Sequence, residues 1–139
     1  MTRFVLDCSV AMAWCFEGEA DAYTDAVLRA LAKGTAVVPS LWPLEIANVL
    51  LIAERRRRLS GADTIRFLDL VGGLPIVVDG PPGLQDLHAL LALGRQHRLS
   101  AYDAAYLHLA MREELPLASH DRGLRAAARA AGVPEFSGR

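Results

Sequence analysis

Four acidic residues of this 139-residue chain stand next to apolar segments, where an isolated carboxylate is unfavourable: Asp7, Glu45, Asp103 and Asp121. If they converge in the fold, they repel one another. Two unit charges about 4 Å apart cost on the order of 4 kcal/mol at an effective dielectric of about 20. Such a cluster is therefore either partly protonated or neutralised by a cation. An all-oxygen ligand set without His or Cys favours a hard ion, Mg²⁺ or Mn²⁺.

An ion of this kind has a recognisable chemistry. It keeps bound waters, binds phosphate oxygens, lowers the pKa of a bound water and stabilises charge on a leaving oxygen. These are the requirements of phosphodiester hydrolysis. The hypothesis requires all four acids to lie close together. Each of them also has an alternative interpretation, a local structural role.

Asp103 is an unusual position for a carboxylate, because it shares a predicted helical face with apolar residues. Tyr106, Leu107 and Ala110 follow it by three, four and seven residues. The local alternative is a capping box, in which the carboxylate bonds back to Ser100. The position of Asp103 on the apolar face favours a functional role.

The other three acids also have local alternatives. Asp7 directly follows an apolar run and could form an Asx turn at a helix start. Glu45 lies early in a helix that is apolar almost all round, where interaction with the helix N-terminus is worth about 0.3–1 kcal/mol at a surface. Asp121 could simply favour the first turn of the last helix, with Ser119 as its cap.

The elements that must position these acids are short apolar strands alternating with helices. Strands are expected at residues 3–6, 36–38, 75–78 and 115–118, with an additional edge strand at 133–136. Helices are expected at 9–14, 20–31, 41–59, 60–71, 84–97, 101–113 and 121–131, the third capped by Ser40 with Pro43 in its first turn. This alternation predicts an α/β layer fold with a mainly parallel sheet.

A parallel sheet would bring the four acids to one place. Asp7 and Asp121 both follow strands, and Glu45 and Asp103 both lie in first turns of helices. Strand ends and the starts of the helices that follow them share one edge of such a sheet, which is where ligands bind. The sequence therefore predicts a single acidic pocket.

Length and composition set the class. With 53% hydrophobic and 22% charged residues, the chain is expected to be one globular domain over residues 1–139. Its net charge of −1 gives no overall attraction to nucleic acid or membrane. No membrane span is expected, because no apolar run reaches about 18 residues, and the apolar run in MTRFVLDCSV is shorter than a signal peptide is expected to have. Cys8 and Cys15 are expected on one helix about 10 Å apart, too far for a disulfide. A cytoplasmic location is the best match.

In these motifs the sequence resembles PIN-domain proteins, specifically VapC-type ribonuclease toxins of bacterial toxin–antitoxin pairs. Four segments occur in the family's order over essentially the whole chain: VLDCSV, LWPLEIANVL, LSAYDAAYLHLA and LASHDRGLRAAARAAGV. The resemblance implies a three-layer α/β/α PIN-like domain and Mg²⁺-dependent endoribonuclease activity, with Mn²⁺ as a substitute. It assigns the metal to Asp7 and Asp103 most directly, with Glu45 and Asp121 acting directly or through water.

The resemblance also implies supporting residues and partners. Ser9 and Ser119 match small hydroxyl positions near the site. Family members commonly form homodimers and are silenced by a cognate antitoxin whose tail blocks the acidic pocket. RNA is the implied substrate.

Basic residues offer contacts for the phosphate backbone of RNA. Arg122 and Arg125 lie on one predicted helical face, together with Arg129, and begin beside Asp121. The run of arginines at 55–58 is better explained as a solvated helix end. His120 could act in proton transfer, although an exposed loop histidine is the simpler interpretation.

Two other classes compete with a metal nuclease. An aspartyl-phosphate phosphatase would need a second Asp two residues after Asp7, where this chain has Ser9. A non-catalytic PIN-fold module that binds RNA or a protein keeps the fold without the chemistry. The complete set of four acids argues against it, since a module that binds polyanions gains nothing from crowded carboxylates.

Overall fold

The computed structural model describes residues 2–138 and contains a four-stranded parallel sheet in the order β3-β2-β1-β4. The strands are β1 (Thr2–Leu6), β2 (Gly34–Val38), β3 (Ile76–Val78) and β4 (Leu117–Ala118). Val5 of the central strand pairs with Val37 on one side and with Leu117 on the other. Because all four strands are parallel, their carboxyl ends lie at one edge of the sheet.

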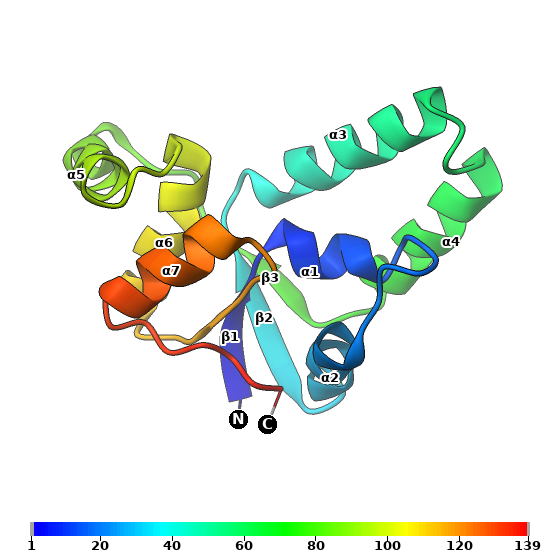
Figure 1. Ribbon diagram of the computed structural model, residues 1–139, viewed down its shortest axis with the longest axis horizontal. Helices are drawn as coiled ribbons and strands as arrows, with labels where there is room; N and C mark the ends of the chain where they lie inside the picture. The colour runs from blue at the N-terminus through cyan, green and yellow to red at the C-terminus, as the bar shows by residue number, and fades with distance from the viewer. Residues whose placement is uncertain (1, 139) are drawn as a thin grey trace.

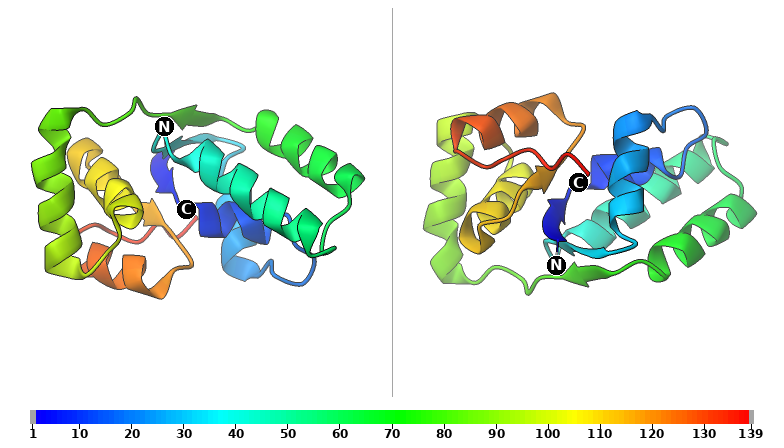
Figure 2. Two further views of the ribbon diagram at one scale, coloured as in Figure 1. Left: turned by 90° about the horizontal axis from the view of Figure 1, so that it is seen from above. Right: turned by 90° about the horizontal axis from the view of Figure 1, so that it is seen from below.

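Helices cover both faces of this sheet. They are α1 (Cys8–Ala13), α2 (Ala22–Ala30), α3 (Trp42–Arg55), α4 (Gly61–Gly72), the 3₁₀ turn η1 (Leu84–Asp86), α5 (Leu87–His97), α6 (Ala101–Glu113) and α7 (Arg122–Ala130). Figure 1 shows α6 and α7 on one side of the strands and α1 and α2 on the other. The two views of Figure 2 show the same division, with α5 outermost beside α6 and α3 beside α1. The expected three-layer α/β/α domain with a parallel central sheet is confirmed.

Burial explains why the central strand is apolar throughout its second half. Phe4, Val5 and Leu6 are all fully buried, as expected for a strand covered by helices on both faces. Tyr106 and Leu107 of α6 are also fully buried against this core. The apolar face predicted for α6 is therefore real, and Asp103 lies at its first turn.

The structure corrects several predicted boundaries. α3 ends at Arg55, well short of residue 59, and Arg57 takes a left-handed backbone with φ +58° that no helix continues. Ser40 does not cap this helix: Leu41 occupies the N-cap position with helical backbone angles and no side-chain cap. Pro43 stands in the first turn, as predicted.

Other expectations are met in part. The edge strand expected at 133–136 is reduced to a single bridge between Leu117 and Glu135. α1 ends at Ala13, so Cys15 lies beyond it, and both cysteines are free thiols, as predicted. Within residues 2–138, no helix has both the length and the apolar character that crossing a bilayer requires.

Candidate active site

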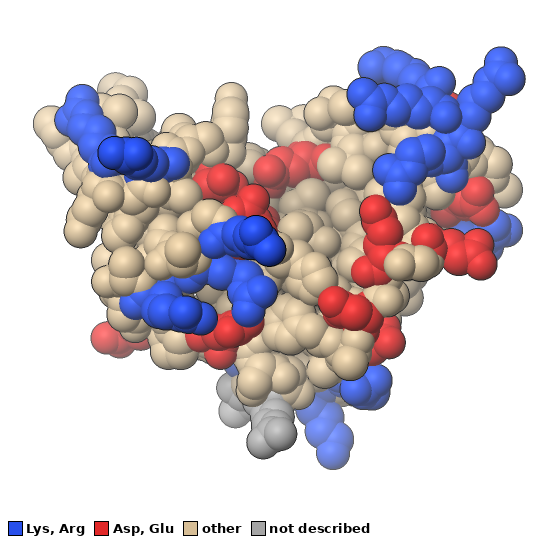
Figure 3. Space-filling model, viewed as in Figure 1, with Lys and Arg blue, Asp and Glu red and all other residues tan. Residues whose placement is uncertain are grey.

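The carboxyl edge of the sheet holds the predicted acids. Asp7 follows β1 directly, and Asp121 lies three residues after β4, the strand that pairs with β1. The backbone N–H of Asp7 donates to the carbonyl of Ala118 at 2.9 Å, which joins the two strand ends. The prediction that Asp7 and Asp121 share one edge is therefore correct. Figure 3 shows acidic side chains gathered in the hollow between the two raised parts of the molecule.

Asp7 is buried, with 6% of its surface exposed, and two serine hydroxyls hold its carboxylate. Ser9 donates to Oδ2 at 2.6 Å and Ser119, itself 1% exposed, donates to the same oxygen at 2.8 Å. Burial raises the pKa of Asp7 above its ordinary value, the two hydroxyls lower it, and the charge of Asp121 raises it further. Ser9 and Ser119, expected near the site, thus orient its most buried acid.

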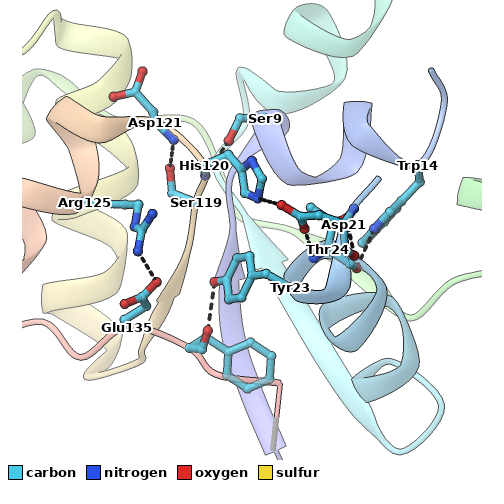
Figure 4. A network of polar contacts seen from close by, with 11 residues as sticks. Ser9, Trp14, Asp21, Tyr23, Thr24, Ser119, His120, Asp121, Arg125 and Glu135 are labelled. Carbon is cyan, nitrogen blue, oxygen red and sulfur yellow. Dashed lines mark hydrogen bonds and ion pairs between the residues drawn. The ribbon is translucent and has the colours of Figure 1, made fainter. Parts of the chain in front are cut away.

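The turn between β4 and α7 completes a ring of hydrogen bonds around Asp7. The N–H of Asp121 donates to Oγ of Ser119 at 3.0 Å, and the N–H of His120 donates to Oγ of Ser9 at 2.9 Å. Figure 4 draws these two contacts as dashed lines. Both hydroxyls accept from the turn and donate to Asp7, so their orientation is fixed.

Glu45 is positioned by a residue that sequence reasoning assigned only to the core. The hydroxyl of Tyr106 donates to Oε1 of Glu45, and the N–H of Cys8 approaches the same hydroxyl at 3.4 Å. Burial raises the pKa of Glu45, the Tyr106 hydrogen bond lowers it, and the charges of Asp7 and Asp103 raise it. The available signal was the residue type, because a buried Tyr needs a partner for its hydroxyl.

Asp103 does not use its carboxylate for capping. Its N–H donates to Oγ of Ser100 at 3.1 Å, which is only half of a capping box. Among residues 2–138, no group donates a hydrogen bond to its half-buried carboxylate. Burial raises the pKa of Asp103, and the charges of Asp121 and Asp7 raise it further. The capping-box alternative therefore leaves the side chain unexplained.

Asp121 combines a local role with an electrostatic one. It is the N-cap of α7, and its Oδ1 accepts from the N–H of Leu124 at 2.8 Å. Its charge also raises the pKa of both Asp7 and Asp103. The predicted alternative is correct in giving Asp121 a role at the start of the last helix, but the cap is Asp121 itself and not Ser119, whose hydroxyl is used by Asp7.

These residues suit a hard divalent ion without forming a closed cage for one. In the part of the chain that is described, no three His, Cys, Asp or Glu side chains converge closely enough to enclose a metal ion. Mg²⁺ does not require this, because it usually keeps several waters and binds through one or two carboxylates. The all-oxygen donors, the free carboxylate of Asp103 and the mutual repulsion of the acids are what a hydrated Mg²⁺ would satisfy.

Basic side chains lie on either side of the acidic hollow. Figure 3 shows them on both raised parts of the molecule and beside the hollow between these parts. Arg125 of α7 pairs with Glu135 at 2.8 Å, whereas Arg122 at the start of α7 has no ion pair within the described chain. Arg58 lies over the ring of Phe16 at 4.3 Å, so part of the arginine run packs locally.

The fold and the site together define an α/β domain with an acidic centre at the carboxyl edge of a parallel sheet. A family model described as PIN domain matches residues 4–130. This span is most of the chain, and the chain therefore belongs to the PIN domain family. A search of curated proteins finds no significant match to this sequence.

Two solved structures share the fold. One, described as PAE2754 from Pyrobaculum aerophilum, is 24% identical with a TM-score of 0.67, covering 91% of this chain and 86% of that chain. The other, described as FitAcB from Neisseria gonorrhoeae, is 18% identical with a TM-score of 0.63, covering 97% of each chain. At these identities the similarity establishes the arrangement of elements.

Proposed function

We propose that this protein is a Mg²⁺-dependent endoribonuclease that hydrolyses RNA phosphodiester bonds and acts as the toxin of a type II toxin–antitoxin pair. The observation that carries the proposal is the acidic site at the carboxyl edge of the sheet, where Asp7 is buried and the carboxylate of Asp103 has no hydrogen-bond donor within residues 2–138. Burial and neighbouring acids raise the pKa of Asp7, Glu45 and Asp103. Folding does not need such a cluster, and a divalent cation relieves its repulsion. Membership of the PIN domain family supports nuclease activity.

The chain's own residues divide the work. Asp7 and Asp103 would hold Mg²⁺ most directly, and Glu45 and Asp121 would act directly or through water. When bound, the ion supplies a water of lowered pKa and stabilises charge on the leaving oxygen. Ser9 and Ser119 hold Asp7 in place through its Oδ2, and Tyr106 orients Glu45.

Substrate binding is assigned to the basic side of the hollow. Arg122 directly follows Asp121 at the start of α7, and Arg125 lies one turn further along this helix. Both would contact RNA phosphates without regard to sequence. Ser9 and Ser119 belong to the same wall of the site, with their hydroxyls committed to Asp7.

The toxin role draws on the order of the four motifs, which resembles VapC-type toxins, and on the similarity in fold to FitAcB. The partners implied are a cognate antitoxin that blocks the acidic pocket and a second copy of the chain. A cytoplasmic location follows from this role.

A non-catalytic PIN-fold module that binds RNA or protein is the second candidate. The open spacing of the acids within residues 2–138 favours it, because no three of them enclose an ion as they stand. The two candidates differ in one measurable respect: a nuclease turns over RNA in Mg²⁺, and a binding module does not.

The test is cleavage of RNA by purified protein in Mg²⁺, in EDTA and after Asp7→Asn. Asp69→Asn is the matched control, since Asp69 is an exposed acid on α4 away from the strand ends. We expect wild type and Asp69→Asn to cleave only with the metal, and Asp7→Asn to be inactive. Cleavage that ignores both EDTA and Asp7→Asn would disprove the metal nuclease, and binding without cleavage would support the module.

A further inference from the structure

The turn that joins β4 to α7 carries more of the site than its length suggests. β4 has only two residues, and the turn after it leaves His120 and Asp121 exposed. Yet the turn supplies the hydroxyl of Ser119 and two backbone N–H groups to the ring around Asp7. A small rotation of the turn would therefore disturb both serine hydroxyls that hold this carboxylate.

The side chain of His120 connects this turn to α2. Its Nε2 lies 3.2 Å from Oδ2 of Asp21, and its ring stacks on Tyr23 with centroids 5.7 Å apart and planes inclined by 23°. In Figure 4 the imidazole points toward Asp21, whereas the carboxylate of Asp121 points the other way. The ring is thus directed toward α2 and away from the carboxylate of Asp121.

The first turn of α2 is a firm anchor for this contact. Asp21 and Thr24 form a reciprocal capping box, with Thr24 N–H donating to Oδ1 at 2.8 Å and Asp21 N–H donating to Oγ1 at 2.9 Å. Thr24 is fully buried. Because capping uses Oδ1 of Asp21, Oδ2 is free to face His120.

The same turn of α2 is tied to the other two segments that surround Asp7. Nε1 of Trp14, just after α1, donates to the carbonyl of Thr24 at 2.9 Å. The hydroxyl of Tyr23 donates to the carbonyl of Phe136 at 2.8 Å, and Phe136 stacks on Phe4 of β1 at 3.9 Å. α2 is therefore linked to α1, to the turn after β4 and, through Phe136, to β1.

We infer that His120 is a positioning residue of the metal site: clamped by Asp21 and Tyr23, it fixes the turn whose N–H groups orient Ser9 and Ser119 on Asp7. The inference rests on the proposed function, because it concerns the affinity of the same carboxylates for a divalent ion. Groups that orient metal ligands from outside typically change metal affinity by about 10–100-fold when removed.

The test measures Mn²⁺ affinity by calorimetry without RNA, in wild type, His120→Ala, His120→Gln and His120→Asn. The amide nitrogen of Gln reaches the place of imidazole Nε2 and can donate to Asp21, whereas that of Asn is one methylene short. We expect His120→Ala and His120→Asn to lose about tenfold in affinity, at the lower end of such effects. His120→Gln is expected to stay close to wild type.

Two controls separate positioning from a general effect on folding. His88→Ala removes an exposed histidine from α5 and should leave Mn²⁺ affinity unchanged. The melting temperature of each variant without metal reports the structural role alone. A lowered melting temperature with unchanged Mn²⁺ affinity in His120→Ala and His120→Asn would overturn the inference.

The outcomes distinguish this inference from the proposed function. If the wild type binds Mn²⁺ but never cleaves RNA, the proposed nuclease activity is disproved, and the comparison of the His120 variants still tests the positioning role. If the wild type cleaves RNA and all His120 variants bind Mn²⁺ equally, only the positioning role is disproved. If the wild type does not bind Mn²⁺, both proposals are disproved. If His120→Ala fails to fold, the comparison of His120→Gln with His120→Asn decides.

Discussion

The hydroxyl of Tyr106 donates a hydrogen bond to Oε1 of Glu45 and so joins α6 to α3 across a separation of 61 residues. The ring of Tyr106 is fully buried, whereas Glu45 is half-buried. Burial raises the pKa of Glu45 and this hydrogen bond opposes the rise. The phenol therefore helps to keep Glu45 ionised, which the proposed metal site would require.

Tyr106→Phe should raise the pKa of Glu45 further, because the buried ring stays and only the opposing hydrogen bond is lost. We expect the acid limb of the pH–rate profile to move to higher pH. The free energy of unfolding should fall by about 1–2 kcal/mol, as for a lost hydrogen bond to a charged group that is partly solvated. Tyr102→Phe is the matched control, since Tyr102 on the same helix is 67% exposed. An acid limb that is identical in both variants would contradict this role.

Asp103→Asn should raise the melting temperature of the metal-free protein at neutral pH by about 2–4 °C, since it removes one of several charges that repel each other. The pH dependence has a definite sign. Because the folded state raises the pKa of Asp103, the folded wild type binds more protons than the unfolded chain above the ordinary value of 3.8. Wild-type stability from this group therefore falls as pH rises, so the advantage of Asp103→Asn should shrink on acidification.

Asp63→Asn provides the opposite case on the same measurement. Hydrogen bonds from Ser60 lower the pKa of Asp63, so its charged form stabilises the fold above the ordinary value. Asp63→Asn should therefore be less stable than wild type at neutral pH, with the difference vanishing on acidification. If Asp103→Asn behaves like Asp63→Asn, Asp103 is a structural cap after all.

Divalent ions should stabilise the wild type, because an ion that binds only the folded state adds RT ln(1 + [L]/Kd) to its stability, about 2.7 kcal/mol at 100 times Kd. We expect a rise in melting temperature of about 5–10 °C in Mn²⁺ or Mg²⁺. Asp7→Asn should abolish the rise and Asp69→Asn should keep it. An equal rise in both variants would place the ion elsewhere on the protein.

The location of the site could be predicted because it follows from topology. Asp7 and Asp121 each come after an apolar run. Because β1 and β4 pair in parallel, both residues must lie at the carboxyl edge of the sheet. Helical periodicity likewise placed Asp103 and Tyr106 on one face of α6. These conclusions require only the period of each element and the direction of its strands.

The partners of the side chains could not be predicted in this way. The pairing of Tyr106 with Glu45 depends on how two helices pack, and no local pattern encodes that distance. The predicted end of α3 at residue 59 was wrong for a local reason. Arg57 takes a left-handed conformation that is uncommon for a residue other than Gly, and the helix ends before it. The clamp on His120 similarly requires α2 to lie beside the turn after β4.

Arg122 and Arg125 of α7 should differ in their contribution to RNA binding, although both are predicted from the sequence to contact RNA phosphates. Arg122→Ala should weaken binding across RNA sequences and reduce the slope of log K against log salt by about 1. Arg125→Ala should cost less, because Glu135 already holds that guanidinium at 2.8 Å. Glu135→Gln should release Arg125 and strengthen binding, most clearly at low salt.

Lys33→Ala is the control, since Lys33 lies next to the start of β2 at the opposite edge of the sheet. Equal losses in Arg122→Ala and Lys33→Ala, measured by salt titration of RNA binding, would mean that only overall charge matters and that α7 does not line the substrate path.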